Sequence, residues 1–432
     1  MQLIRSIQRH ETLVKTWRLL HSCVVSVLLR LNADHVRRLL LHGVIGVSIY
    51  GVFAFMLGGM YRYPWELVGV VMRLNYVTVR TVAGYVARGC KPLYPEWTLA
   101  FELLRAWMRC IMSVYGDRLV LPKNAQFLRW QSDWIGTREG RDACRLHGTT
   151  METFEHNNLE HIWVRGRVLN PSKTTRPRRL VVLYFHGGGF AVLSPRMYVR
   201  YANEILAKIN DKLAREHVHS PVQVDFLMGN YRKIPEHPYP IPPQDAYCVY
   251  EYLIHHEKLD PSQIIVAGDS AGGALAITTL LRIRDRHMEP PLAGLVSCPF
   301  VDMTVKGNEL ETPHCIIGDK AIHAVIKSYH SFEGDPATWG DVSPVHCNLR
   351  GLPPVYIQAA ELDYILPHSL NLYAKAKADG LDHWVLDVHK NLPHVYTTTP
   401  SWILPAVHQG FDALATFAAG RFAESMRNAP CA

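Results

Sequence analysis

Ser270 is the residue whose surroundings most clearly indicate chemistry. It lies in the sequence GDSAGG, which begins at Gly268, between an apolar run (263–267) and a helical pattern (271–286). A sharp turn between a strand and a helix holds such a serine in a strained conformation with its hydroxyl exposed, and small neighbours avoid clashes there. The helix N-terminus also favours negative charge that develops beside it. We therefore interpret Ser270 as a nucleophile whose turn is supported by Gly268, Asp269 and Gly272.

A second glycine-rich turn follows the apolar run 180–185 and reads HGGGF from His186. Because glycines carry no side chain, the backbone N–H groups of such a run can approach a substrate oxygen closely. They would meet the negative charge on a carbonyl oxygen under attack, where the loss of one donor typically costs about 3 kcal/mol. A nucleotide-binding loop is not supported, because no G-x-x-x-x-G-K-[ST] pattern follows. His186 and Gly187 thus open a predicted oxyanion loop.

A serine nucleophile needs a general base, and the base needs a carboxylate that fixes its tautomer. Among 23 histidines we prefer His394, which follows the apolar run 384–388 in the loop sequence Asn-Leu-Pro-His. Asp363, which follows the run 354–359, is the preferred carboxylate. The runner-up for the base is His389, and the poorer candidates for the acid are Asp382 and Asp387.

The C-terminal two-thirds of the chain alternates short, β-branched apolar runs with helical patterns. This alternation predicts an α/β fold with a mostly parallel sheet and helices on both faces. Loops that carry chemistry gather at the carboxyl ends of the strands in such sheets, and each motif above follows a predicted strand. The predicted strands are 180–185, 222–228, 263–267, 292–297, 354–359 and 384–388, and the predicted helices are 198–215, 243–256, 271–286, 369–378 and 404–422.

Other chemistries fit the sequence less well. Chymotrypsin-like proteases carry a similar glycine-flanked serine, but they are all-β and place the histidine and aspartate before the serine. The nine cysteines form no CxxC pair, so a zinc site or a thioredoxin-like redox site has no support. The net charge of +8 comes from dispersed residues without a nucleic-acid motif, so we expect no nucleic-acid partner. Acyl transfer by a serine, histidine and aspartate requires no metal or organic cofactor, and we expect none.

Three ordered motifs resemble those of one family. HGGGF, then YRKIPEHPYP from Tyr231 with Asp245, then GDSAGG are similar to the hormone-sensitive-lipase-like family of α/β hydrolases, including its membrane-anchored arylacetamide deacetylases and steryl acetyl hydrolases. The resemblance covers residues 95–427 and implies the α/β-hydrolase fold with a helical cap. It implies a serine carboxylesterase acting on short-acyl esters, for example acetyl esters, of apolar alcohols or lipids. It also implies an oxyanion hole built from the N–H groups of Gly188, Gly189 and Ala271.

The resemblance leaves two other functions open. An amide deacetylase would use the same triad, and the sequence does not separate it from an esterase. A ligand-binding receptor on the same fold is the second alternative, as in the plant gibberellin receptors, which resemble the family but have lost the catalytic histidine. Because this chain retains His394, the receptor is disfavoured. The chain departs from the family at Val395, where glycine commonly follows the histidine, and at Pro367, where a second acid is common.

The segment 39–60 contains no Asp, Glu, Lys or Arg and predicts a transmembrane helix. As a helix it would span roughly 33 Å, enough for a hydrocarbon core of about 30 Å. Arg37 and Arg38 flank one end and aromatic residues flank the other. The charges of the whole N-terminal arm favour a cytoplasmic N-terminus, which predicts a single-pass membrane protein with a lumenal catalytic domain in the endoplasmic reticulum. A buried core helix is the alternative interpretation.

These observations predict four parts. They are a basic arm (1–38), the transmembrane helix (39–60), a juxtamembrane amphipathic segment (61–94) and a hydrolase domain (95–427) with a cap formed by 97–150 and 304–341. A helix at 64–87 would lie on the membrane surface or pack as an ordinary amphipathic helix, and the pattern does not choose between these. The expected partners are a small apolar ester and membrane lipid, and the sequence does not indicate an oligomeric state.

Overall fold

An eight-stranded sheet organises the C-terminal two-thirds of the chain. The computed structural model describes residues 22, 60–61, 63–216, 220–304, 307, 311–330 and 339–428. The chain divides into two compact units, Met1–Arg73 and Leu74–Ala432, and the sheet belongs to the second. The strand order is β1-β2-β4-β3-β5-β6-β7-β8. The strands are β1 (Thr150–His156), β2 (Leu159–Leu169), β3 (Arg178–Phe185), β4 (Val222–Gly229), β5 (Ile264–Asp269), β6 (Ala293–Ser297), β7 (Val355–Ala360) and β8 (Val385–His389).

The sheet is mostly parallel, as predicted. β1 and β2 form an antiparallel hairpin, β2 is also antiparallel to β4, and every other neighbouring pair is parallel. The six predicted strands are β3 to β8, with ends within two residues of those expected. The loops that follow β3, β5, β7 and β8 therefore lie at the same edge of the sheet, where the sequence places its motifs.

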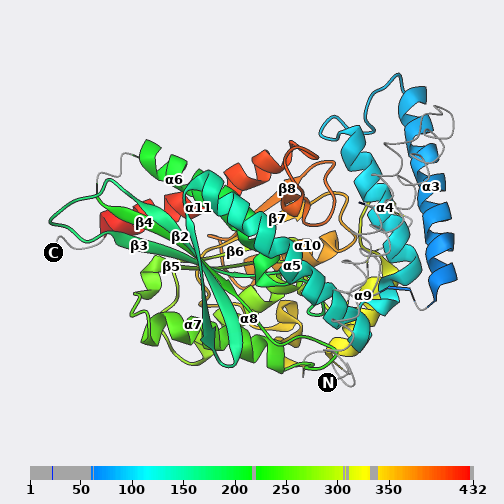
Figure 1. The fold of residues 1–432 in the computed structure, drawn as a ribbon. Helices are drawn as coiled ribbons and strands as arrows, with labels where there is room; N and C mark the ends of the chain where they lie inside the picture. Colours follow the sequence, from blue (N-terminus) through cyan, green and yellow to red (C-terminus); the bar gives the residue numbers. More distant parts are fainter. Residues whose placement is uncertain are drawn as a thin grey trace. The chain divides into compact units, whose positions relative to one another are not determined.

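Helices cover both faces of the sheet. Alternate side chains of β3 enter two separate cores, because successive residues of a strand point to opposite faces. One core packs against α6 and α11, and the other packs against α7, α8 and α10 (Figure 1). The helices are α3 (Pro64–Ala87), α4 (Leu99–Tyr115), α5 (Pro122–His147), α6 (Val199–Arg215), α7 (Ile241–His255), α8 (Ser270–Asp285), α9 (Asp319–Tyr329), α10 (Leu366–Ala378) and α11 (Val407–Asn428).

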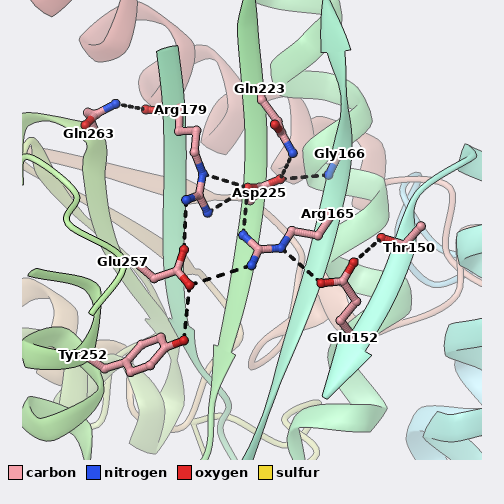
Figure 2. A network of polar contacts seen from close by, with 10 residues as sticks. All are labelled: Thr150, Glu152, Arg165, Gly166, Arg179, Gln223, Asp225, Tyr252, Glu257 and Gln263. Carbon is pink, nitrogen blue, oxygen red and sulfur yellow. Dashed lines mark hydrogen bonds and ion pairs between the residues drawn. The ribbon is translucent and has the colours of Figure 1, made fainter. Parts of the chain in front are cut away.

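A buried carboxylate ties β2, β3 and β4 together near the start of β3. Asp225 on β4 is fully buried and accepts hydrogen bonds from Arg165 on β2 and Arg179 on β3 (Figure 2). It also accepts from the N–H of Gly166 at 3.0 Å, where the pairing of β2 with β4 shifts register. Both arginines reach Glu257, which follows α7. A buried charge is tolerated only with such partners, so this cluster fixes the irregular part of β2 and the end of α7 on the sheet.

The structure corrects the membrane prediction. Among the described residues, no helix is both long enough and apolar enough to cross a membrane. The helix predicted at 64–87 is present as α3, but Glu66, Arg73 and Arg80 interrupt its apolar surface. The predicted span 39–60 lies outside the described residues except for Met60. Because no described helix can cross a membrane, the prediction of a single-pass membrane protein with a lumenal catalytic domain is wrong.

Candidate active site

Ser270 lies at the turn between β5 and α8 in a strained backbone conformation. Its φ is 50°, in the left-handed region that residues other than glycine rarely adopt. Two glycines permit this turn to pack against the end of β3. A Cβ atom on Gly268 would lie 2.7 Å from the carbonyl oxygen of Phe185, and one on Gly272 would lie 2.6 Å from that of His186. The tight turn exposes the serine hydroxyl and brings the start of α8 against the HGGGF loop.

Three side chains from separate loops form a hydrogen-bonded row. The His394 Nε2 atom lies 2.9 Å from the Ser270 hydroxyl, and its Nδ1 atom lies 2.8 Å from Asp363 Oδ2. Ser270 is partly exposed, whereas His394 and Asp363 are buried. An ionised carboxylate only accepts hydrogen bonds, so Nδ1 carries the proton that it donates to Asp363. The Nε2 lone pair then faces the serine hydroxyl, which is the orientation a general base requires.

The glycine loop presents backbone donors beside this row. Gly188 and Gly189 have φ values of 101° and 59°, which glycine adopts without strain. Within the part of the chain that the structure describes, the N–H groups of both residues make no hydrogen bond. The N–H of Ala271 lies in the first turn of α8, where an amide has no intrahelical partner. These are the three donors that the family resemblance implies for an oxyanion hole.

Asp269, next to the nucleophile, holds the glycine loop instead of joining the triad. It is buried and accepts hydrogen bonds from the Gly187 N–H at 2.9 Å, the Tyr184 hydroxyl at 2.8 Å and the Tyr198 hydroxyl at 3.0 Å. Burial raises the pKa of Asp269 to about 6, although these three donors act in the opposite direction. The carboxylate thus links the nucleophile turn to the first glycine of the loop.

His186 supports the loop as a neutral ring. Burial holds its pKa well below the usual value, so the ring carries one proton. Its Nδ1 lies 2.7 Å from the carbonyl oxygen of Gly187 and therefore donates to it. The ring stacks on Tyr231 at 4.8 Å, and the Tyr231 hydroxyl donates to the His186 carbonyl at 2.8 Å. The second motif of the sequence, which begins at Tyr231, thereby supports the first.

Comparison with known proteins gives the family. A family profile described as "alpha/beta hydrolase fold" matches residues 182–398, half of the chain. The chain belongs to the hormone-sensitive-lipase-like family of α/β hydrolases. An "Esterase" of Acinetobacter venetianus is 26% identical over 282 residues, which are 64% of this chain and 85% of that protein. An "Acetyl-hydrolase" of Streptomyces hygroscopicus is 30% identical over 180 residues, which are 41% of this chain and 55% of that protein.

Solved structures agree with the fold of this α/β hydrolase. An esterase described as a member of the bacterial hormone-sensitive lipase family matches with a TM-score of 0.53 and 24% identity, over 68% of this chain and 98% of that chain. At this identity the likeness concerns the fold. The α/β hydrolase spans about half the length of some curated relatives, such as the Streptomyces protein. The Acinetobacter relative is named as an esterase and a Mycobacterium tuberculosis relative as a carboxylesterase, which agrees with the predicted enzyme class of a serine hydrolase acting on carboxylic esters.

The carboxylate of this α/β hydrolase has partners that the sequence did not reveal. Pro367, at the position where the family resemblance implies a second acid, lies in the first turn of α10. Asp363 Oδ1 instead accepts a hydrogen bond from the Ile365 N–H at 3.0 Å and lies 3.7 Å from the Cys315 sulfur. Burial raises the pKa of Cys315 to about 12, so this thiol is a neutral donor. Backbone and thiol thus fix Asp363 without a second acid.

The loop that carries His394 is held at a strained position. Val395 has a φ of 46° and Cys298 has a φ of 45°, although both are non-glycine residues and one is β-branched. The Val395 N–H donates to the Cys298 sulfur at 3.5 Å. Strain of this kind persists only where the surroundings enforce it, and it concentrates at functional sites. The site therefore stores strain at both loops that flank the imidazole.

Helix α9 lies directly against the oxyanion loop. A Cβ atom on Gly189 would lie 2.8 Å from a methyl group of Val325, and the ring of Phe190 stacks on Tyr329 at 4.0 Å. Arg109 on α4 donates to the carbonyl of Ile317 at 2.7 Å, just before α9. Both segments predicted to form a cap thus contribute helices that contact each other. The boundaries of that cap stay a prediction.

The alternative candidates have other partners. His389 lies at the end of β8, where its Nε2 is 3.1 Å from Asp387. Asp387 also accepts a hydrogen bond from the Tyr356 hydroxyl. Asp382 is exposed and lies 3.7 Å from Lys377. None of these atoms has a recorded contact with the triad, so the preferred residues are the ones that the structure brings together.

Proposed function

We propose that this protein is a serine carboxylesterase that hydrolyses short-acyl esters of apolar alcohols or lipids through Ser270, His394 and Asp363. The observation that carries the proposal is the continuous row of hydrogen bonds from Asp363 through His394 to Ser270, at 2.8 and 2.9 Å. The amides of Gly188 and Gly189, which make no hydrogen bond among the described residues, and the relative named as an esterase support it.

The geometry suits acyl transfer in two steps. His394 accepts the hydroxyl proton of Ser270 as its oxygen attacks the ester carbonyl, and Asp363 stabilises the imidazolium that forms. The N–H groups of Gly188, Gly189 and Ala271 receive the oxyanion. His394 then protonates the departing alcohol, and a water molecule hydrolyses the acyl-enzyme by the same proton transfers in reverse order.

The preference for a short acyl group rests on two observations. One relative is named as an acetyl-hydrolase. In addition, Val325 on α9 packs within van der Waals distance of Gly189, so an acyl chain bound on that side of the oxyanion loop meets a buried aliphatic side chain. Amide hydrolysis would use the same groups, so the test also measures hydrolysis of an amide substrate.

Hydrolysis of p-nitrophenyl acetate by the wild type and by Ser270→Ala tests this function. The wild type should turn over the ester, and the variant should fall to the background rate. The butyrate and octanoate esters measure the acyl preference, and the matching acetanilide measures the amide alternative. Equal, slow hydrolysis by both proteins would exclude an esterase and leave a binding protein on the same fold.

A further inference from the structure

One cysteine beside the triad has no part in the proposed reaction. Cys298 follows β6, is fully buried and has a strained φ of 45°. Cys298, Asp363 and His394 each offer one potential ligand atom, and these three atoms all lie within 4.8 Å of one another. This is the one such group of three potential metal ligands found among the described residues. Its donors are a sulfur, a carboxylate oxygen and an imidazole nitrogen, which are the donors that zinc prefers.

We propose that Cys298, Asp363 and His394 form a latent inhibitory site for a thiophilic divalent cation such as Zn²⁺. The proposal rests on the proposed hydrolase function, because the site shares two residues with the triad. Bond lengths of about 2.0–2.3 Å place the ligands of tetrahedral zinc roughly 3.3–3.7 Å apart. The donor atoms, which all lie within 4.8 Å of one another, therefore need to draw together by up to roughly 1.5 Å, whereas His394 Nδ1 and Asp363 Oδ2, at 2.8 Å, must separate slightly. A water molecule would complete the coordination.

The position of the ion explains how it inhibits. The ring nitrogen on the Asp363 side is Nδ1, whose proton bonds to Asp363 at 2.8 Å. A cation bound there displaces this proton, which returns to the ring at Nε2, and it releases the thiol proton of Cys298 to the solvent. A neutral imidazole that binds a metal through Nδ1 carries its remaining proton on Nε2. That nitrogen then donates to Ser270 and has no lone pair to accept the hydroxyl proton, so the general base is lost while the protein remains folded.

A matched pair of cysteines makes the proposal testable. Cys315 also lies beside Asp363, at 3.7 Å, but it is not part of the three-ligand group. Zinc binding to Cys298→Ser and Cys315→Ser can therefore be compared by isothermal titration, with inhibition of ester hydrolysis measured in parallel as a fraction of each variant's own activity. Both substitutions keep a polar hydrogen at the site, so both variants can fold with their loops in place.

We expect the wild type and Cys315→Ser to bind one zinc ion and to lose activity in proportion, with recovery on addition of EDTA. Cys298→Ser should bind zinc at least about tenfold more weakly and resist inhibition to the same degree. Cobalt should give a thiolate charge-transfer absorption in the wild type that Cys298→Ser lacks. Equal zinc affinity and equal inhibition in the two serine variants would overturn the proposal. A wild type that binds zinc but is inactive without metal would instead refute the esterase function.

Discussion

Replacing Gly272 with alanine should damage catalysis more than stability. Gly272 has no positive φ, so alanine costs no backbone strain, and any effect comes from the added methyl group. That group would lie 2.6 Å from the His186 carbonyl oxygen and closer still to that of Phe185, whereas ordinary contact begins at 3.4 Å. The end of β3 and the start of α8 must therefore separate by roughly 1.4 Å, the difference between 3.4 Å and the 2.0 Å contact with the Phe185 oxygen, which moves the oxyanion amides away from the nucleophile. A displacement of this size costs about 100-fold in rate, or about 2.7 kcal/mol of transition-state stabilisation.

The assay is kcat/KM for p-nitrophenyl acetate, together with the free energy of unfolding in urea. Gly420→Ala is the control, because a Cβ atom at this position in α11 meets nothing within 4 Å. It should leave kcat/KM unchanged and stabilise the helix by up to about 1 kcal/mol. If Gly272→Ala retained kcat/KM within about threefold of the wild type, the proposed contact between the nucleophile turn and the oxyanion loop would be refuted.

Three further predictions concern buried carboxylates. Asp225→Ala leaves two arginines and the Gly166 amide without their common acceptor, so the free energy of unfolding should fall by about 3–5 kcal/mol in urea, and a loss near zero would contradict the cluster's role. The pKa of Asp269 is raised from 3.8 to about 6 by burial. Its contribution to stability is therefore complete below pH 3.8 and is lost as the pH rises through about 6, by about 3 kcal/mol in all. The free energy of unfolding of Asp269→Asn, measured in urea, should not show this decline with pH. A variant with the same pH dependence as the wild type would contradict the role of Asp269. Asp363→Asn should lower kcat about 10⁴-fold because it favours the wrong tautomer of His394, and a loss below about tenfold would exclude Asp363 as the orienting acid.

The sequence predicts the centre of the fold better than its edge. Strands β3 to β7 are buried on both faces for most of their length, so their apolar runs stand out from the helical patterns between them. The hairpin of β1 and β2 was missed, because β1 is an edge strand with mostly exposed or half-buried residues. Its turn residues, Asn157 and Asn158, both have positive φ, and an Asn-Asn pair at a turn was a signal that sequence reasoning could have used.

The spacing of the motifs predicted which residues lie together in the site. It did not reveal the side chains that hold those residues in place. Tyr184 and Tyr198 hold Asp269, and nothing in the periodicity of a strand or of a helical run marks a hydroxyl that will meet a distant carboxylate. Cys298 and Cys315 reach Asp363 only because separate loops fold over it. Such contacts depend on tertiary packing, which a single sequence does not encode in any local pattern.

The central claim is that Ser270 attacks the ester and carries the acyl group. Rapid quenching of a reaction with excess p-nitrophenyl acetate, followed by digestion and mass spectrometry, measures this directly. One acetyl group should appear on the peptide that contains Ser270. The acetylated fraction should rise in His394→Ala or Asp363→Asn if the substitution slows deacylation more than acylation. Ser270→Ala should show no acetyl group on this peptide. Turnover of the ester with an acetyl group on another residue, or unchanged turnover in Ser270→Ala, would contradict the account.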